Sequence, residues 1–460
     1  MKKFQKEMLG AEGMVLLDTI RRLNRRNAVD HLLRLMEKTH PADLAWVFRH
    51  LNPDERQNVF NIIAQTEHVA EFLSELDQAL MLELVEKLPP QFMVSVFKEM
   101  ASDDAADILE ALPEERALEI RKLMAKSDRE EMDELLQYHP ETAGGIMSPD
   151  FMALDEEMSV GDAIHKIQER SEEKEMSFYL YITHGEERQL CGVLSLRELL
   201  MHPPYRQLKN IMNPKVIAVS AETDQEEVAH IVSQYNFLAV PVVDSSYKLV
   251  GIVTVDDVID VIREEATEEF LQMAGAGKDR EILLKPTVKN ALTRAPWLFA
   301  TWLGGVAASF VITYFQGELQ QMLALAAFIP IVMGMGGNIA TQSSTIVVRG
   351  IATGRVNLQA ISNVIFKEMR VGVLLGLFFG AILGGLAMLR YADAARLGLV
   401  VGISVLVSMT NAATIGSMVP LILRRLDIDT AVATGPFVTT SIDLIGVTVY
   451  LLLAKFMLGL

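Results

Sequence analysis

The stretch AVATGPFVTTSIDLIGVTVYLLLAKFM covers residues 431–457 and is apolar along almost its whole length. A helix of this length can cross the ~30 Å hydrocarbon core of a bilayer. Asp443 lies near the middle, close to the hydroxyl groups of Thr439, Thr440 and Ser441. A charge at that depth costs at least ~2.5 kcal/mol, so such carboxylates usually face a cavity, a partner or an ion. Asp443 is therefore the first candidate for a cation path; a proton-relay group and a structural carboxylate are the alternatives.

Four more apolar segments precede this one. The predicted spans cover residues 295–315, 322–348, 371–389, 397–423 and 431–457. The charges divide the chain at the same place, because residues 285–460 hold 12 Lys or Arg and 6 Asp or Glu, whereas residues 1–284 hold 30 and 54. The sequence thus predicts an acidic soluble region followed by five transmembrane helices in a lipid bilayer. The acidic excess disfavours nucleic acid as a partner and makes divalent cations a candidate.

The basic residues set the orientation, since cytoplasmic flanks carry more Lys and Arg. With a cytoplasmic N-terminus, nine basic residues flank the spans inside: Lys285, Lys289, Arg294, Arg349, Arg355, Lys367, Arg370, Arg424 and Arg425. Only Arg390, Arg396 and Lys455 then flank them outside. Five spans place the C-terminus outside. The first residues lead into no apolar stretch, which predicts no cleaved signal peptide, and the single Cys191 is typical of a reducing compartment.

Two spans carry distinct patterns of small and polar residues. In the third, glycine recurs at every fourth position from Gly372 to Gly384, which predicts close helix packing. In the second, Pro330 and clustered glycines predict a loosened helix with free carbonyls. The candidates for pore lining are Gly336, Gly337, Asn338, Thr341 and Gln342, together with Thr440 of the last span. Interhelical hydrogen bonding is the alternative for these residues. Pro436 predicts an opened backbone one to two turns before Asp443.

The ligands available in the membrane domain indicate a hard cation. All nine histidines lie between His31 and His230, and Cys191 is also outside this domain. A dehydrated transition metal would be expected to use imidazole or thiolate. The remaining ligands are oxygens, which suit Mg²⁺, an ion that usually keeps several waters. A single Asp443 per chain predicts outer-shell binding of a hydrated ion, especially if two chains of a homodimer each contribute one.

The soluble region divides into two parts. Residues 1–135 show apolar positions at helical spacing and starts such as Asn52-Pro53 and Pro89-Pro90, which predicts a small all-α superhelix. Residues 140–262 contain a repeat, since Ile146-Met147-Ser148-Pro149 returns as Ile211-Met212-Asn213-Pro214. Each half reads strand, helix, strand, strand, helix, and residues 240–244 and 249–253 are the clearest strands.

The repeat resembles a tandem CBS pair, and the whole chain resembles the MgtE family of magnesium transporters. The motifs are YHPETAGGIM at 138–147, the segment 330–342, and Ser441-Ile442-Asp443. The resemblance implies an all-α superhelical domain (1–135), two α/β CBS units (136–200 and 201–262), a connecting plug helix (263–290) and a five-helix membrane domain (291–460). It also implies a homodimeric Mg²⁺-selective channel in the bacterial plasma (inner) membrane, with Asp443 as the pore carboxylate.

The family also has a cytosolic Mg²⁺ sensor. The matching acids are Asp103, Asp107, Asp224, Glu226, Asp257, Asp260, Glu265 and Glu268, with Asn236 where a relative carries an acid. A solvated acidic face is the alternative. We expect these carboxylates to repel one another when Mg²⁺ is low, and Mg²⁺ to bridge them and hold the pore shut when it is high.

A nucleotide site is also predicted. CBS pairs often bind ATP or another adenosine nucleotide through Gly-x-x-Ser/Thr-x-x-Asp, and Gly251, Thr254 and Asp257 match this pattern. The first half has Glu198 in place of the acid that would bind the ribose. Two other functions are consistent with the sequence: a proton-coupled divalent cation carrier, and a CBS-based membrane sensor without transport. An enzyme is not expected, because no nucleophile–base pair or phosphate-binding loop is present.

Overall fold

The computed structural model describes residues 2–169, 179–185, 188–277, 282, 286–353, 356, 361–391, 395–426, 428–430 and 435–459. The chain divides into two compact units, Met1–Ile262 and Arg263–Leu460, and the division falls within helix α14 (Val255–Met273). Lys285, Arg355 and the first four residues of the predicted fifth span, 431–434, lie outside the described residues.

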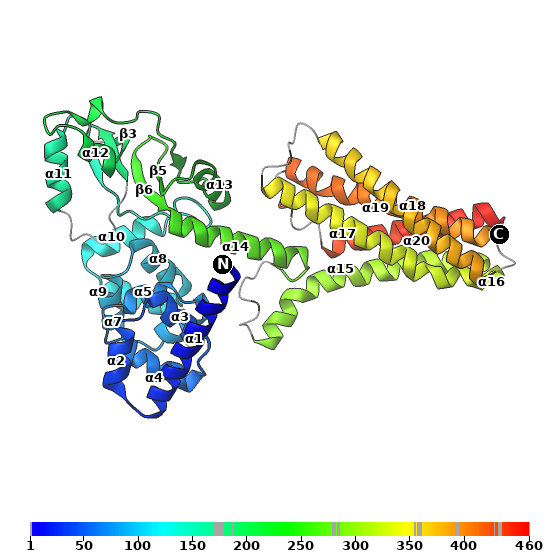
Figure 1. Ribbon diagram of the computed structural model, residues 1–460, viewed down its shortest axis with the longest axis horizontal. Helices are drawn as coiled ribbons and strands as arrows, with labels where there is room; N and C mark the ends of the chain where they lie inside the picture. The colour runs from blue at the N-terminus through cyan, green and yellow to red at the C-terminus, as the bar shows by residue number, and fades with distance from the viewer. Residues whose placement is uncertain are drawn as a thin grey trace. The chain divides into compact units, whose positions relative to one another are not determined.

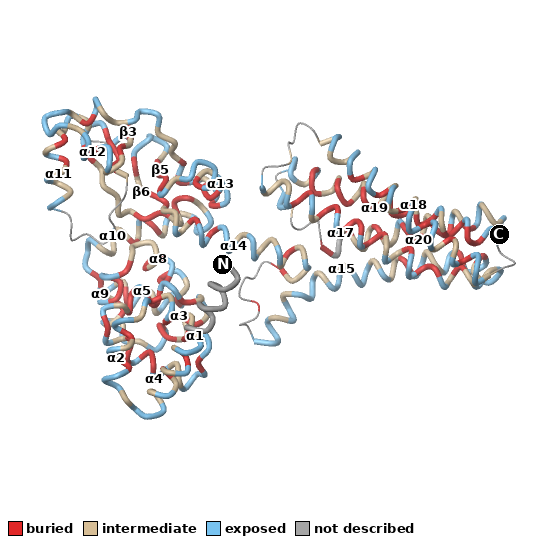
Figure 2. Tube along the Cα trace, viewed as in Figure 1, coloured by how far each residue is buried: buried red, intermediate tan, exposed pale blue. Residues whose placement is uncertain are grey.

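The first unit begins with ten helices (Figure 1): α1 (Lys2–Arg25), α2 (Val29–Met36), α3 (Pro41–Arg49), α4 (Pro53–Ile63), α5 (Val69–Ser74), α6 (Gln78–Val85), α7 (Pro90–Phe97), α8 (Ser102–Ala111), α9 (Glu114–Leu123) and α10 (Lys126–Leu135). Asn52 and Glu55 form a capping box at α4, and proline occupies the first turn of α3, α4 and α7. Odd-numbered helices stack from α3 to α9, and α8 packs on both α6 and α10. The predicted all-α superhelix is confirmed, and buried apolar residues recur along its helices (Figure 2).

Two three-stranded sheets follow, one from each half of the repeat. The first half holds β1 (Ala153–Asp155), α11 (Val160–Glu169), β2 (Tyr179–His184), β3 (Gln189–Ser195) and α12 (Leu196–Met201), and a 3-10 turn η1 (Leu208–Asn210) comes next. The second half holds β4 (Val219–Ser220), α13 (Gln225–Tyr235), β5 (Ala239–Val243), β6 (Leu249–Thr254) and α14. In each sheet the middle strand runs parallel to the first and antiparallel to the third. The predicted repeat and its two clearest strands are confirmed.

The two halves exchange the segments that precede them. Ser148 pairs with Ile252 of β6, and Asn213 pairs with Val193 of β3. A Cβ atom on Gly251 would lie 2.6 Å from Met147 Sδ, and one on Gly192 would lie 2.3 Å from Met212 Sδ. Each half is thus covered by a methionine of the repeated motif, and only glycine leaves room for it. We call Met147 and Met212 the exchanged methionines.

The connector after the repeat differs from the prediction. The sequence predicts a separate helix over 263–290, but α14 continues the repeat's last helix from Val255 and stops at Met273. Gly275 (φ +69°) and Gly277 (φ +92°) adopt left-handed backbone conformations there, which end a helix at little cost. The next helix, α15, begins at Thr287.

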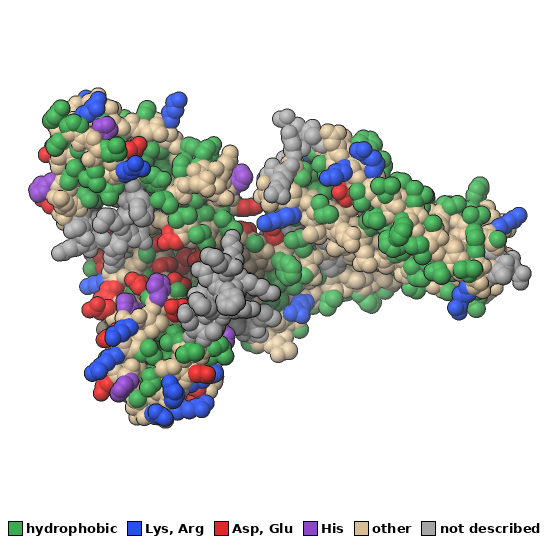
Figure 3. All heavy atoms as spheres, viewed as in Figure 1, with side chains coloured by type: hydrophobic (Ala, Val, Ile, Leu, Met, Phe, Trp, Pro, Cys, Tyr) green, Lys and Arg blue, Asp and Glu red, His purple; other side chains and the backbone are tan. Residues whose placement is uncertain are grey.

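Among its described residues, the second unit contains five segments long and apolar enough to span a membrane, as predicted. Its elements are α15 (Thr287–Tyr314), α16 (Gln316–Gln321), η2 (Leu323–Phe328), α17 (Ile329–Ala352), α18 (Ile361–Arg390), α19 (Ala395–Arg425) and α20 (Pro436–Leu458). Hydrophobic side chains cover most of its visible face, with basic ones toward the ends of the long helices (Figure 3). At one end, Tyr450 Oη donates to the Leu325 carbonyl at 2.9 Å, and Lys455 Nζ lies 2.6 Å from Glu318 Oε1.

The glycine stripe of α18 packs closely against a neighbouring helix, as predicted, and that helix is α19. A Cβ on Gly384 would lie 2.7 Å from the Gly398 carbonyl oxygen, and one on Gly380 would lie 2.5 Å from that of Gly402. The two backbones therefore touch.

The prediction of a loosened second span was wrong. Helix α17 is continuous from Ile329 to Ala352, because Pro330 lies in its first turn, where its missing N–H costs nothing. The short 3-10 helix η2 precedes it. Pro436 likewise begins α20 rather than interrupting it, so the helix starts seven residues before Asp443.

Candidate ion path and acidic regulatory site

Asp443 faces α17 across the interior of the second unit. A Cβ on Gly337 would lie 3.3 Å from Asp443 Oδ1, which is a tight contact, so glycine lets the carboxylate approach α17 without strain. Asp443 Oδ1 is buried, and no described residue gives it a hydrogen bond. Buried carboxylate oxygens normally have donors, ordered water or an ion. The arrangement can therefore bind a hydrated cation through an oxygen that the protein leaves unsatisfied.

A third helix, α19, comes close to α17 and α20 here through Ser408. Its Oγ is buried without a described partner and lies 3.0 Å from a Cβ built on Gly336 and 3.1 Å from one built on Gly446. Asp443 and Gly446 are three residues apart and share a face of α20. Helices α17, α19 and α20 thus meet at glycines, with hydroxyl and carboxylate oxygens between them.

The other predicted pore-lining residues are spread over several environments. Gly336 is buried, whereas Asn338 and Gln342 are exposed on α17. Thr341 is half-buried, and its hydroxyl donates to the Gly337 carbonyl at 3.1 Å. Thr440 packs against Gly304 of α15, where an added Cβ would clash with its methyl group. Of this set, Gly337 lies against Asp443.

Sequence reasoning missed a second buried carboxylate. Glu368 of α18 is 7% exposed and accepts a hydrogen bond from Ser343 Oγ at 2.8 Å. The predicted third span begins at residue 371, which leaves Glu368 in the charged flank with Lys367 and Arg370. A signal was available, because Glu368 lies four residues before Gly372 and so continues the buried glycine stripe by one turn.

Acids also gather in the first unit, at the start of α14. The pKa of Asp257 is raised to about 6, chiefly by burial and also by the charges of Asp256 and Asp104, while hydrogen bonds from Thr254 oppose the rise. Burial likewise raises the pKa of Asp104 of α8, with contributions from Asp256 and Asp260 and an opposing hydrogen bond from Ser74. Four carboxylates therefore interact here, and Asp104 was missed because Ser102-Asp103-Asp104 looked like an ordinary helix start.

The other predicted sensor residues of the first unit lie on α8 and at the start of α13. Asp103 is half-buried and Asp107 exposed, both on α8. Asp224 caps α13 by accepting the Glu226 N–H at 2.8 Å, and both residues are exposed. Asn236 ends that helix at φ +54°, a conformation that asparagine tolerates better than most residues. In the described part of the chain, no three Asp, Glu, His or Cys side chains converge closely enough to form a complete metal cage.

The second half of α14 lies beside the end of α17 and beside the residue that precedes α20. Glu269 pairs with Arg349 near the end of α17 at 3.8 Å. A Cβ on Gly435, just before α20, would lie 3.4 Å from the Gln272 carbonyl oxygen. Glu268 accepts a hydrogen bond from Gln272 at 2.9 Å, and Glu265 is half-buried.

The nucleotide motif forms a helix cap. Asp257 Oδ2 accepts hydrogen bonds from the Thr254 hydroxyl and, at 3.3 Å, from the Thr254 N–H. Ser195 and Glu198 form the equivalent capping box in the first half. Gly251 lies beneath Met147. The acid in each half therefore has a structural role whether or not a nucleotide binds.

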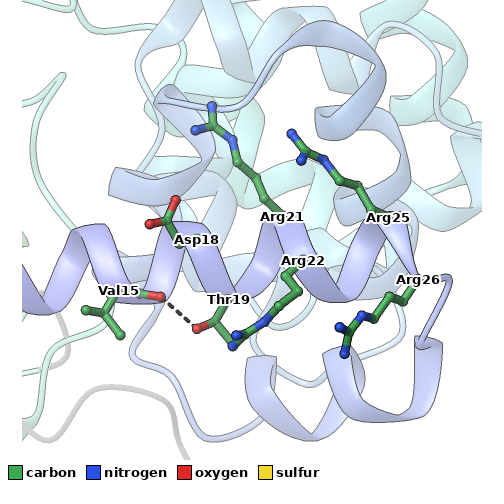
Figure 4. A pocket seen from close by; sticks show the side chains of 7 residues that line it. All are labelled: Val15, Asp18, Thr19, Arg21, Arg22, Arg25 and Arg26. Atoms are coloured by element: carbon green, nitrogen blue, oxygen red, sulfur yellow. Dashed lines mark hydrogen bonds between the residues drawn. The ribbon is translucent and has the colours of Figure 1, made fainter.

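A surface groove of about 610 Å³ lies along α1 (Figure 4). Its lining includes four arginines, and Arg21 already contacts Glu55 at 3.3 Å. Arginine repels cations, so this groove is separate from the candidate cation sites.

These features define a multi-pass membrane protein with a helical domain and a CBS pair before its spans. A family model described as a divalent cation transporter matches residues 329–453, the MgtE intracellular N domain model matches 39–141, and CBS domain models match 143–204 and 208–264. The magnesium transporter MgtE of Thermus thermophilus is 36% identical over 433 residues, covering 93% of this chain and 95% of the relative. That of Bacillus subtilis is 32% identical over 416 residues, covering 90% and 91%. The chain belongs to the MgtE family of magnesium transporters.

Solved structures agree with this assignment. The cytosolic domain of the Mg²⁺ channel MgtE in complex with ATP has a TM-score of 0.51 and 34% identity, and covers 53% of this chain and 99% of that one. The soluble part of a magnesium transporter has a TM-score of 0.50 and 29% identity, with coverages of 55% and 99%.

Proposed function

We propose that this protein is a Mg²⁺-selective channel whose ion passes Asp443 and whose opening is controlled by cytosolic Mg²⁺. The observation that carries the proposal is the buried Asp443 Oδ1, which faces Gly337 without a described hydrogen-bond donor. An oxygen of this kind can accept hydrogen bonds from the waters of a hydrated ion. The Ser408 hydroxyl adds a second oxygen near the same layer.

The cluster of Asp104, Asp256, Asp257 and Asp260 would sense Mg²⁺. Their four carboxylates repel one another, so ionising them together costs free energy. A divalent cation would offset that cost and so favour the conformation that holds these carboxylates together. We include Asp103, Asp107, Asp224, Glu226, Glu265 and Glu268 as further participants, each contributing a weak ligand.

The connector would transmit this change to the ion path. Helix α14 begins with Asp256 and Asp257 and ends beside Arg349 of α17 and Gly435 of α20. Helices α17 and α20 are the two that bring Gly337 to Asp443. A shift of α14 that depends on bound Mg²⁺ therefore biases the spacing at Asp443.

The assembly we propose is a homodimer in the bacterial inner membrane, with a cytoplasmic N-terminus and an outer C-terminus. Exposed polar groups on α17 support a second chain, because Asn338 and Gln342 would otherwise meet lipid. The basic flanks support the orientation.

We also propose that the CBS pair binds ATP, because the related cytosolic domain of the Mg²⁺ channel MgtE has been solved in complex with that nucleotide. Gly251, Thr254 and Asp257 would contact the nucleotide. Isothermal titration of ATP into the purified protein measures this, and an absence of binding heat in the wild type would reject it.

Mg²⁺ entry into proteoliposomes tests the channel. We expect wild-type protein to admit Mg²⁺ under a negative interior potential, with Asp443→Asn lowering the rate at least about tenfold because the amide removes the charge that faces the ion. Thr448→Val is the matched control, since the Thr448 hydroxyl on the same helix already bonds the Leu444 carbonyl. Equal flux in wild type and Asp443→Asn would reject the proposed path. Flux that requires a pH gradient would favour the proton-coupled carrier.

A further inference from the structure

Glu368 is a buried carboxylate that has no role in the ion path proposed above. It lies in the third turn of α18 with 7% of its surface exposed, and its described hydrogen bond comes from Ser343 of α17, itself 2% exposed. Charged side chains within spanning helices are rare and usually belong to ion or proton pathways.

The packing of α17, α18 and α19 brings Glu368 close to α17. A Cβ on Gly416 of α19 would lie 2.5 Å from the Ala340 carbonyl of α17, so these backbones touch. A Cβ on Gly372, one turn after Glu368, would lie 2.9 Å from the Met409 carbonyl of α19. Small residues on α19 thus bring α17 and α18 close enough for Ser343 to reach the carboxylate.

No cationic side chain among the described residues neutralises Glu368. Its neighbours Lys367 and Arg370 are exposed, and residues one or two positions apart do not share a helix face. The adjacent Ser344 Oγ is also fully buried and has no described partner. A carboxylate held by one hydroxyl retains lone pairs that no described donor satisfies, which is unfavourable in an apolar interior unless water or a cation supplies the rest.

We propose that Glu368 is a second cation station on the ion path, distinct from Asp443. Ser343 is six residues after Gly337 on α17, which corresponds to ~9 Å along the helix axis. The hydrated Mg²⁺ that leaves Asp443 would next be attracted to Glu368, whose remaining lone pairs can accept hydrogen bonds from its waters. This inference rests on the proposed transport function and adds a residue to it.

The competing explanation is a structural clasp, in which the Ser343–Glu368 hydrogen bond only joins α18 to α17. The two explanations make opposite demands on the side chains. A cation station needs the negative charge, whereas a clasp needs the hydrogen bond. Glu368→Gln removes the charge and keeps an acceptor for Ser343, and Ser343→Ala removes the hydrogen bond and keeps the charge.

Mg²⁺ entry into proteoliposomes, with initial rate and half-saturating Mg²⁺ concentration measured, distinguishes them. We expect Glu368→Gln to lower the rate at least about tenfold and Ser343→Ala to change it less than about twofold. Normal flux in Glu368→Gln overturns the proposal. Equal losses in both variants also overturn it, because they indicate the clasp.

Two further variants keep the test decisive. If Glu368→Gln fails to fold, as judged by size-exclusion chromatography, Glu368→Asp replaces it, since it keeps the charge and shortens the reach to Ser343. We expect folded Glu368→Asp to conduct, and its failure would overturn the proposal. Asp443→Asn is measured in parallel: if it conducts normally while Glu368→Gln does not, the Asp443 path fails and the Glu368 station stands.

Discussion

At the residue scale, equivalent acids in the two halves of the repeat have opposite properties. Glu198 and Asp257 both cap the helix after a third strand. The hydrogen bonds from Ser195 lower the pKa of Glu198, whereas burial and neighbouring carboxylates raise that of Asp257 to about 6. The same local motif is therefore solvated in one half and crowded with negative charge in the other.

If Asp257 takes part in the proposed Mg²⁺ sensor, the response to Mg²⁺ should depend on pH. Its folded-state pKa of about 6 lies above the ordinary ~3.9, so without Mg²⁺ the free energy of unfolding decreases as pH rises from 4 through 6. Mg²⁺ must displace the proton. We expect the Mg²⁺ concentration that half-protects the full chain from protease to be about fourfold higher at pH 5.5 than at pH 7.5, because about a quarter of Asp257 is ionised at the lower pH.

Two variants check the cause of this shift. Asp257→Asn should remove most of the pH dependence, and Glu198→Gln, the matched control, should keep it. If Mg²⁺ does not change the protection of the wild-type chain from protease, the proposal of a Mg²⁺ sensor is rejected.

At the element scale, packing could be predicted from spacing more reliably than helix ends could. The four-residue glycine period of α18 predicted a face for close helix packing, because residues four apart lie along one side of a helix, and the structure shows that this face meets α19. The same approach misjudged Pro330, since proline loosens a helix only away from its first turn, and the sequence does not say where that turn lies. It also missed Glu368, whose burial depends on α17 and α19.

The α18 stripe gives a direct packing test. Gly384→Ala places a Cβ 2.7 Å from the Gly398 carbonyl and must separate two backbones, whereas Gly385→Ala meets nothing within 4 Å. Overpacking costs about 1–3 kcal/mol. We expect Gly384→Ala to lower the thermal unfolding temperature in detergent and Gly385→Ala to leave it unchanged or raise it slightly. Equal melting of both variants would contradict the close contact.

At the scale of the whole molecule, the number of Asp443 residues per ion path is the central question. One chain supplies a single Asp443, and in the homodimer that we propose a second chain would supply another. Fold class, five spans and the repeat could all be predicted from sequence, because each depends on a pattern repeated many times. The residues that face the proposed ion path could not be predicted in this way, because they depend on how separate helices, or separate chains, are brought together.

Mixing variants tests the dimer. Equal amounts of wild type and Asp443→Asn are unfolded, refolded together and reconstituted. If each path needs two Asp443 residues, only about a quarter of the dimers conduct, whereas independent chains keep about half of the wild-type flux. Mixing after separate reconstitution is the control, and it should give half in either case.

The exchanged methionines have a consequence for how this chain could be divided. Met147 belongs to one half and covers Gly251 of the other, while Met212 and Gly192 make the reciprocal contact. Each half needs a methionine from the other half to complete its packing. We therefore expect the pair to fold as one cooperative unit. Cutting the chain between the halves should therefore yield two fragments that are each unfolded alone and that regain structure by complementation when expressed together.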